Sequence, residues 1–525
     1  MNSRPLRRYL AAIALFGAHL IAAAHSQEEA TFPNIVYILA DDMGYGDVQC
    51  LNPERGKIPT PHMDAVAREG MTFTDAHTSS SVCTPTRYSV LTGRYHWRTH
   101  LQKGVLNGYG LPLIAAERTT VPSFLKEHGY TTAMIGKWHL GLDIPTTDGK
   151  DARAKNVSGE RNVEVDPASI SNIDWNGTIK GGPVNLGFDS WYGISASLDF
   201  PPYVWIRDNK FAGAGTQIKA FRRNGPADRD FEAIDVLDEF ARETAEFITD
   251  YKEDAPFFIY MPLTSPHTPI VPSGKWQGKS PLGPYGDFMM QTDDVVGQVI
   301  AALDAKGLSE NTLVIVTSDN GCSRAAKIDD LEEHGHFPSA QFRGSKADLW
   351  EGGHRVPFLV KWPAVIKSGT LNHTLTCQTD LLATCAEIVN AKLPGNSGED
   401  SVSILPAFRG QDITTSRKGI VNHSVSGHFA YREGDWKLLL AHGSGGWTAP
   451  DEAAARRAGL PKAQLYHLAD DPGETTNIFE SNPGKAQALL DQLTTYVHSG
   501  RSTGGPESSN DIPNEDINLW KSEKR

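Results

Sequence analysis

The stretch Asn34-Ile-Val-Tyr-Ile-Leu-Ala-Asp-Asp42 joins a continuous apolar run to a pair of carboxylates. An apolar run of this length, without alternating polar residues, indicates a strand that is buried on both faces. Three later runs have the same form, at Thr131–Ile135, Phe257–Met261 and Leu313–Thr317. Each of them ends in chemically capable residues: Lys137 and His139, Ser265 and His267, and Asp319 and Asn320. The sequence therefore predicts a buried sheet with polar side chains at the ends of its strands.

Helical patterns lie between these predicted strands. Apolar residues recur at helical spacing in residues 240–248 and again in residues 295–303. Strands that alternate with helices are typical of an α/β fold, in which helices flank the sheet. Ligands of such sheets bind beyond the carboxyl ends of the strands, so we expect the polar ends to form one site.

The pattern changes after about residue 400. Short strands are indicated at Phe429–Tyr431, Trp436–Leu440 and Gln464–Leu468, and an amphipathic helix over residues 489–497. We therefore predict a catalytic domain over residues 27–400 and a smaller α+β domain over residues 401–500. Residues 501–525 form a polar tail, which we expect to be loosely held.

The first 26 residues have the composition of an export signal. Arg4, Arg7 and Arg8 precede the apolar run Tyr9–Ala24, and Ala24-His-Ser26 is a small-x-small cleavage site. The alternative is an uncleaved membrane anchor, for which the run is short. We expect a cleaved signal and a protein exported to the periplasm or the cell exterior, with no membrane attachment afterwards.

Charge and cysteine content narrow the function classes. The formal net charge is -13, so the chain is not a nucleic-acid binder held by bulk charge. Five cysteines in 525 residues do not make a disulfide scaffold. An anionic substrate would need a local basic pocket.

One cysteine stands in an unusual context, the run Cys83-Thr-Pro-Thr-Arg-Tyr-Ser-Val-Leu-Thr-Gly-Arg94. Pro85 suits the first turn of a helix, so Cys83 is expected near the positive N-terminus of that helix. Arg87 lies one turn on and can reach back to position 83. From these residues alone, Cys83 is either a thiolate nucleophile, with His139 or His267 as its base, or an inert buried cysteine.

The pairs Asp41-Asp42 and Asp319-Asn320 supply hard oxygen ligands. Ca²⁺ and Mg²⁺ prefer carboxylate and amide oxygens, and both pairs follow predicted strands. Each pair alone is more typical of a turn than of a metal site. Together, and beside the run at Cys83, the pairs favour a metal site.

These motifs resemble those of the formylglycine-dependent type I sulfatases, within the alkaline-phosphatase-like superfamily. The run from Cys83 matches the C-x-P-x-R…L-T-G-R signature of that family. Other segments similar to the family are Asp41-Asp42, Gly136-Lys-Trp-His-Leu-Gly141, Ser265-Pro-His-Thr-Pro269, Ser318-Asp-Asn-Gly321, Arg343-Gly-Ser-Lys346, Trp350-Glu-Gly-Gly353, Gln464-Leu-Tyr-His-Leu468 and Asp471-Pro-Gly-Glu474. The resemblance implies a large mixed sheet flanked by helices, with a short antiparallel sheet in the smaller domain.

The resemblance also implies a cofactor set and a role for each matching residue. Cys83 would be oxidised to formylglycine by a maturation enzyme and would join one Ca²⁺ ion. His267 would protonate the leaving alcohol and His139 would take a proton from the hydrated aldehyde. The implied catalytic residues are Cys83, Arg87, Lys137, His139, His267 and Lys346, and the implied metal ligands are Asp41, Asp42, Cys83, Asp319 and Asn320.

The expected substrate is a sulfated oligosaccharide derived from a polysaccharide. Ser197 resembles a family position near the sulfate, and His428 is expected to close the pocket over the sugar. Residues 203–230 form a basic segment, which either grips a second anion or is a solvated loop. Two rival functions stay open: a phosphonate or phosphate monoester hydrolase of the same superfamily, and a catalytically silent carbohydrate-binding homologue.

Overall fold

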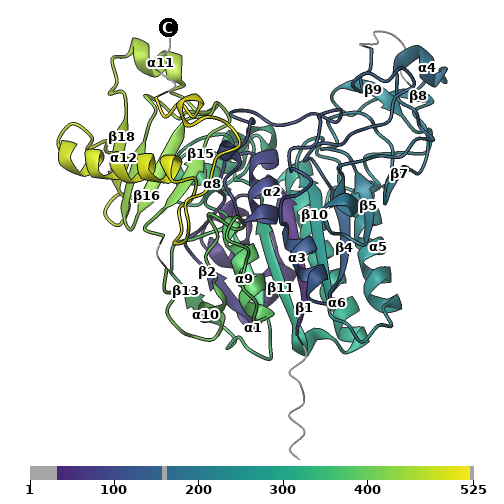
Figure 1. Cartoon of the computed structure of the whole chain (residues 1–525), viewed down its shortest axis with the longest axis horizontal. Helices are drawn as coiled ribbons and strands as arrows, with labels where there is room; N and C mark the ends of the chain where they lie inside the picture. The colour runs from purple at the N-terminus through teal and green to yellow at the C-terminus, as the bar shows by residue number, and fades with distance from the viewer. Residues whose placement is uncertain (1–31, 156–161, 416, 521–525) are drawn as a thin grey trace, which may run out of the picture. The chain divides into compact units, whose positions relative to one another are not determined.

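A ten-stranded mixed sheet positions the predicted site (Figure 1). The structure is a computed structural model that describes residues 32–155, 162–415 and 417–520. Five neighbouring strands of the sheet run parallel: β11 (Thr312–Ser318), β1 (Asn34–Asp41), β10 (Phe257–Pro266), β4 (Thr131–Lys137) and β5 (Ser190–Ile194). The predicted α/β fold with a large mixed sheet is thereby confirmed.

Short strands extend the sheet on both sides of this parallel centre. On one side lie β12 (Phe358–Lys361), β2 (Met71–Phe73) and β13 (Thr370–Asn372), and on the other lie β6 (Ile206–Arg207) and β7 (Lys210–Phe211). Two small pairs stand apart from it, β3 (Ala76–His77) with β14 (Thr376–Cys377), and β8 (Gln217–Ala220) with β9 (Asn224–Ala227). The central strands therefore lie inside the sheet, where both of their edges are paired.

Helices cover both faces of the sheet, which explains why its strands have continuous apolar sequences. One face packs against α1 (Pro61–Glu69), α5 (Val236–Asp250) and α6 (Gly283–Lys306). The other packs against α2 (Cys83–Thr92), α3 (Val121–Glu127) and α9 (Leu381–Ile388). Shorter helices are α4 (Pro167–Ile170), α7 (Ile328–Glu333), α8 (Glu351–His354), α10 (Leu405–Phe408) and α11 (Glu452–Arg457).

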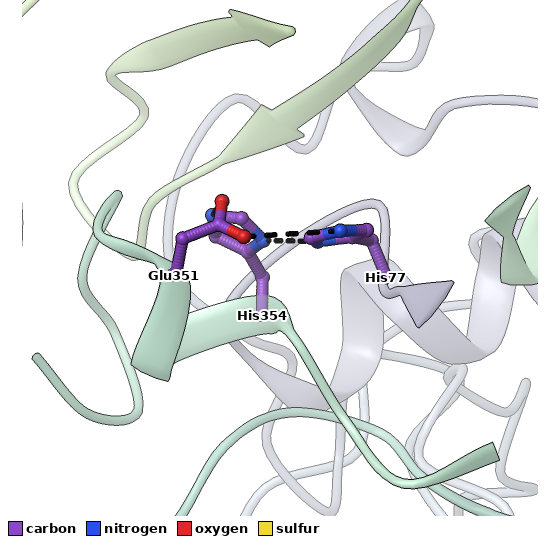
Figure 2. Close-up of side chains that lie close together, drawn as sticks. All are labelled: His77, Glu351 and His354. Atoms are coloured by element: carbon purple, nitrogen blue, oxygen red, sulfur yellow. Dashed lines mark hydrogen bonds and ion pairs between the residues drawn. The ribbon is translucent and has the colours of Figure 1, made fainter. Parts of the chain in front are cut away.

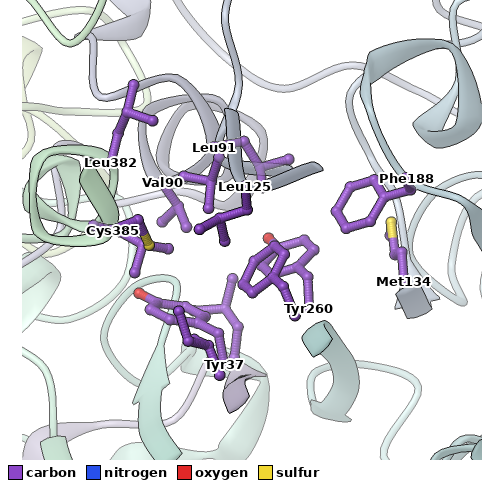
Figure 3. Close-up of a cluster of buried hydrophobic side chains, with 14 of the residues drawn as sticks. Tyr37, Val90, Leu91, Leu125, Met134, Phe188, Tyr260, Leu382 and Cys385 are labelled. Carbon is purple, nitrogen blue, oxygen red and sulfur yellow. The ribbon is translucent and has the colours of Figure 1, made fainter. Parts of the chain in front are cut away.

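Alternate residues of β1 belong to different cores. Val36 and Ile38 pack with α5 and α6, whereas Tyr37 packs on the opposite face, beneath α2 and α9. Figure 3 shows Tyr37 and Tyr260 below Val90, Leu91, Leu125, Leu382 and Cys385. This second core fixes α2 against the sheet, and with it the position of Cys83 at the first turn of α2.

A four-stranded antiparallel sheet forms the later part of the chain. Its order is β15 (Ile420–His423), β16 (Phe429–Glu433), β17 (Trp436–Leu439) and β18 (Gln464–His467). The sequence predicted the last three of these strands but not β15. The predicted amphipathic helix is α12 (Pro483–His498), whose Leu489, Leu493 and Val497 share a buried core with this sheet. The boundary near residue 400 stays a prediction.

The expectation of a loosely held tail is wrong for residues 501–520. Arg98 donates to the Asn510 side chain at 2.9 Å, and Arg94 donates to the Ser509 carbonyl oxygen at 3.0 Å and to Asp511 at 3.1 Å. Arg94 and Arg98 are fully buried, and a buried guanidinium must find acceptors. The polar residues of this segment, from which the sequence analysis predicted a loose tail, accept hydrogen bonds from these two buried arginines.

The predicted signal segment, residues 1–26, lies outside the described residues. In the part of the chain that the structure describes, no helix combines the length and the apolar composition that a membrane span needs.

Candidate active site

The carboxyl ends of β1, β11, β10 and β4 bring the predicted site residues together. β1 lies between β10 and β11, so Asp41 and Asp42 at its end stand beside Asp319 and His267. The backbone N–H of Asp42 donates to Asp319 Oδ1 at 3.2 Å, and Asn320 Nδ2 donates to Asp42 Oδ1 at 2.7 Å. The sheet register thus converts four separate sequence motifs into one buried cluster.

Three buried cations surround the carboxylates. Lys137 Nζ lies 2.5 Å from Asp41 Oδ2, and Lys346 Nζ lies 2.5 Å from Asp42 Oδ1. Arg87 donates through Nε and Nη2 to Asp319 Oδ2, at 3.0 and 2.6 Å. Each cation is therefore hydrogen-bonded to one of the three carboxylates, as a buried charge requires.

The pKa values of two neighbouring carboxylates, Asp41 and Asp319, shift in opposite directions. Burial alone would raise the pKa of Asp41, but Lys137, His267 and Arg87 hold it well below its usual value. Burial and the neighbouring charge of Asp41 instead raise the pKa of Asp319. A further cation beside these carboxylates would remove that conflict.

Unpartnered oxygens show where such a cation fits. Asp41 Oδ1, Asp42 Oδ2 and Asn320 Oδ1 are buried and accept no hydrogen bond from the residues that the structure describes. Buried polar atoms without partners are costly and call for a ligand. Carboxylate and amide oxygens are hard donors that suit Ca²⁺ or Mg²⁺. The residues present therefore fit the predicted ion.

Cys83 is buried at the N-terminus of α2. Burial raises the pKa of its thiol, although the charges of Lys137 and Lys346 act in the opposite direction. A thiol with a raised pKa is a poor nucleophile, because the thiolate is the reactive form. This environment disfavours the thiolate alternative that the sequence left open.

His139 has two nitrogens in different environments. Nε2 lies 2.7 Å from the carbonyl oxygen of Leu106, which can only accept, so Nε2 carries the hydrogen. Nδ1 is buried and has no hydrogen-bond partner among the described residues. Burial, Lys137 and Arg87 lower the pKa of His139 well below its usual value. The ring is therefore neutral near pH 7, with a free lone pair at Nδ1.

His267 is fixed in the opposite way. Its Nδ1 donates to the carbonyl oxygen of Thr268 at 2.5 Å, and its Nε2 lies 3.7 Å from Asp42 Oδ2. Burial lowers the pKa of His267. Nε2 is thus the atom through which His267 can exchange a proton, on the side of the cluster where Lys346 lies.

Comparison with known proteins assigns the family. The family model described as Sulfatase matches residues 33–391, more than half of the chain. The chain belongs to the sulfatase family. A Bacteroides thetaiotaomicron protein named N-acetylgalactosamine-6-O-sulfatase is 32% identical over 511 residues, covering 88% of this chain and 92% of that protein. Human arylsulfatase A is 30% identical over 512 residues, covering 90% and 89% of the two chains.

Solved structures agree with this assignment. One, described under the metabolism of multiple glycosaminoglycans by Bacteroides thetaiotaomicron, superposes with a TM-score of 0.74 at 29% identity, covering 89% of this chain and 99% of the other. The predicted family is therefore confirmed. As a sulfatase, the protein is a sulfuric ester hydrolase.

Two predicted substrate-binding residues lie in different parts of the sulfatase. Ser197 follows β5, next to the end of β4, and its Oγ is buried with no partner in the described part of the chain. His428 precedes β16, and its Nδ1 contacts the carbonyl oxygen of Leu440 at 3.1 Å. Ser197 thus follows a strand next to the cluster, and the turn that carries His428 is bonded to the segment beside Lys346, through the Val425 N–H and the Ala347 carbonyl oxygen at 3.2 Å.

The sequence analysis missed Asp199 as a site residue. It follows β5 as the predicted residues follow the other strands, and it is buried. The strand Ser190-Trp-Tyr-Gly-Ile194 mixes polar and apolar residues, so no continuous apolar run marks it. A search for polar residues after mixed strands would have found it.

A second buried cluster lies in this sulfatase, around His77, Glu351 and His354 (Figure 2). A lysine already lies in this cluster. Its Nζ, in Lys437, is 2.9 Å from Glu351, 2.9 Å from Glu474 and 3.0 Å from His354 Nε2. The side-chain nitrogens and oxygens of His77, Glu351 and His354 all have partners among the described residues, so this cluster, unlike the first, leaves no atom for a metal ion. The family-like segments around Glu351 and Glu474 therefore join β17 to α8 and do not bind metal.

Proposed function

We propose that this sulfatase hydrolyses sulfate esters of a sulfated carbohydrate, with formylglycine at position 83 and one Ca²⁺ ion. One observation carries the proposal: residue 83 begins α2 beside a buried cluster whose Asp41, Asp42 and Asn320 each keep an unpartnered oxygen. The carbohydrate substrate is supported by the relative named N-acetylgalactosamine-6-O-sulfatase, which the chain matches over most of its length.

The chain's own residues divide the work around these groups. Hydrated formylglycine supplies a hydroxyl nucleophile, and Ca²⁺, held by Asp41, Asp42, Asp319, Asn320 and residue 83, offsets negative charge on the sulfate. Lys137 and Lys346 add positive charge on opposite sides of the cluster, and Arg87 holds Asp319 in place.

Two histidines handle protons in this proposal. His139 Nδ1 is a free base and accepts a proton from the residue at position 83. The protonated His267 ring would deliver its Nε2 proton to the leaving alcohol oxygen, with Lys346 nearby; Asp41 and Asp42 favour that protonated form, against the effect of burial. Their different hydrogen bonds, Nε2–H to Leu106 and Nδ1–H to Thr268, fix which nitrogen each histidine uses.

The deciding experiment combines mass mapping with a substrate comparison. Peptide mass spectrometry of the active protein is expected to find the aldehyde at position 83, which reacts with hydrazides. Sulfate and phosphonate monoesters of one alcohol are then assayed side by side, and the sulfate is expected to be turned over faster. An intact thiol in the active enzyme contradicts the nucleophile. A preference for the phosphonate favours the rival hydrolase, and absence of turnover favours the silent homologue.

The metal is tested with Asp319→Asn. This variant removes one carboxylate charge and should cut kcat by about 100-fold or more, because charge stabilisation at a metal site carries a large part of catalysis. Calorimetric titration of the chelator-treated protein with Ca²⁺ should show binding to the wild type and much weaker binding to the variant. Asp330→Asn, which changes an exposed carboxylate, is the matched control. Equal Ca²⁺ affinity of the wild type and Asp319→Asn contradicts the assignment.

We also propose that residues 1–26 direct export to the periplasm or the cell exterior, and that a formylglycine-generating enzyme is a transient partner of the unfolded chain. Both rest on sequence: the arginine-led apolar run of the first residues and the motif from Cys83 to Arg94. Pulse-labelled chains should shorten at Ser26 on export, and unchanged length contradicts the signal.

A further inference from the structure

The loop after β5 packs against His139. The backbone N–H of His139 donates to the Ser195 carbonyl oxygen at 2.9 Å, which ties the end of β4 to this loop. Further along the loop, the Phe200 ring lies 5.8 Å from the His139 ring. Asp199 is next to Phe200, and the charges of His267 and Lys137 act on its carboxylate, so it lies close to the proposed site residues.

Asp199 is held by the turn between β8 and β9. Arg223 Nη1 donates to Asp199 Oδ2 at 2.5 Å and to the Asp199 carbonyl oxygen at 3.1 Å. The Arg223 guanidinium lies 4.0 Å from the centre of the Phe200 ring, and Arg222 lies 3.9 Å from Asp199 Oδ2. Two arginines of the basic segment therefore lie beside a single carboxylate, which Arg223 contacts most closely.

The other oxygen of Asp199 has no partner. Oδ1 is buried and accepts no hydrogen bond from residues 32–155, 162–415 and 417–520. The whole Asp199 side chain is only 5% exposed. Burial would raise the pKa of Asp199, but His267, Arg223 and Lys137 lower it, so the carboxyl is ionised at neutral pH. An ionised, buried and unpaired acceptor calls for a donor from a ligand.

The surroundings select the kind of donor. A cationic group would be repelled by Arg223 and Lys137, which already stabilise the Asp199 charge. A sulfate or carboxylate would be repelled by Asp199 itself. A neutral hydroxyl donates one hydrogen bond at no cost in charge, and sugars carry hydroxyls beside their sulfate esters.

We propose that Asp199 Oδ1 accepts a hydrogen bond from a free hydroxyl of the same sugar unit that carries the scissile sulfate, and so determines substrate specificity. Arg223 positions the carboxylate, and Phe200 separates the pair from His139. The site thereby selects sugars in which the position facing Asp199 is a hydroxyl and rejects those in which it carries a second sulfate. This inference rests on the proposed carbohydrate sulfatase function.

The experiment uses the full, matured enzyme and four probes. These are N-acetylgalactosamine 6-sulfate, its 3-deoxy and 4-deoxy analogues, and 4-methylumbelliferyl sulfate, which has no sugar hydroxyl. Asp199→Asn removes the charge with little change of shape, and Asp230→Asn removes an exposed carboxylate of the same segment as the matched control. Thermal melting of both variants checks that the fold is kept.

For the wild type, kcat/KM should fall about 10- to 100-fold on one of the two deoxy analogues, the loss expected for a hydrogen bond to a charged group. On the parent sugar, kcat/KM of Asp199→Asn should be lower than that of the wild type by a similar factor. On the affected deoxy analogue, kcat/KM of the variant and of the wild type should be nearly equal. On the aryl sulfate, the factor by which the variant falls below the wild type should be at least tenfold smaller than on the parent sugar. Asp230→Asn should match the wild type on all four probes.

Other outcomes overturn the inference. One is that Asp199→Asn lowers kcat/KM by the same factor on the sugar and on the aryl sulfate. Another is that the effects of the substitution and of the missing hydroxyl multiply, which shows that they are independent. The third is that the wild type turns over the aryl sulfate but none of the sugars. If Asp199→Asn does not fold, the wild-type series still tests the inference. Equal kcat/KM on the parent sugar and both deoxy analogues would show that the enzyme recognises neither hydroxyl. Failure of the wild type on all four sulfates instead contradicts the proposed function itself.

Discussion

At the residue scale, His139 shows how one side chain receives a defined protonation state. The Leu106 carbonyl oxygen holds the hydrogen on Nε2, and burial with two nearby cations keeps the ring neutral. A base must be unprotonated to act, and a group with a lowered pKa stays unprotonated as the pH falls through its ordinary value of about 6.5. The base function of His139 should therefore persist below that pH.

We predict that His139→Ala lowers kcat by about 100-fold or more, the usual contribution of a general base, with a smaller change in KM. The acid limb of the wild-type pH profile that depends on His139 should lie below about pH 6.5. Steady-state kinetics from pH 4 to 9 measure both. His334→Ala, at an exposed position, is the control and should match the wild type. Unchanged kcat in His139→Ala contradicts the assignment.

A second prediction concerns His267. If its Nε2 protonates the leaving oxygen, His267→Ala should slow alkyl and sugar sulfates, which leave poorly, at least tenfold more than nitrophenyl sulfates, which leave without a proton. A plot of log kcat/KM against leaving-group pKa should become steeper in the variant. Parallel lines for the wild type and the variant would show that His267 does not act as the acid.

At the element scale, buried charges connect the two sheets. Arg432 of β16 donates to Asp75, and Lys437 of β17 contacts Glu351 at the start of α8. These side chains are nearly or fully buried, so the pairs need one another to offset desolvation. They join the four-stranded sheet to segments that lead into the catalytic site.

We predict that Lys437→Met destabilises the protein by about 3–5 kcal/mol, because it leaves Glu351 and Glu474 buried without their shared cation. Urea unfolding followed by circular dichroism measures the change. Lys275→Met breaks an ion pair whose lysine is 69% exposed, and should change stability by less than about 1 kcal/mol. Similar effects of the two substitutions would show that the buried cluster contributes no more than a surface pair.

At the scale of the whole molecule, the last described residues close over buried arginines. Arg94 contacts Ser509 and Asp511, and Arg98 contacts Asn510 and Asp400. Both arginines follow α2, the helix that begins at Cys83. Residues 501–520 therefore contribute to the stability of the segment that follows α2, the helix on which Cys83 lies.

We predict that deletion of residues 501–525 lowers the free energy of unfolding by about 3 kcal/mol, because Arg94 and Arg98 lose charged hydrogen bonds that each contribute about 1.5–3 kcal/mol. Deletion of residues 521–525 alone is the control and should have a much smaller effect. Urea unfolding measures both. If the two deletions behave alike, the contacts of residues 501–520 do not stabilise the fold.

Local sequence predicted much of the fold and of the site. The four apolar runs became β1, β4, β10 and β11, since buried parallel strands need unbroken apolar sequence, and the polar residues after them lie together because those strands are neighbours. β5 was not predicted because its sequence mixes polar and apolar residues, and Asp199, which follows β5, was therefore not considered. The tail was misjudged because its partners, Arg94 and Arg98, lie some 400 residues earlier in the chain.

The sequence by itself determined which segments form the buried strands, which residue types follow them as oxygen donors, and the motif at Cys83. These features depend on neighbours within a few residues. The tertiary structure decided the rest: which oxygens stay unpartnered, which nitrogen of His139 and of His267 is held by a carbonyl oxygen, and that Arg223 is hydrogen-bonded to Asp199. Burial, hydrogen bonding and charge neutralisation act between residues that are distant in sequence, so only the folded chain settles them.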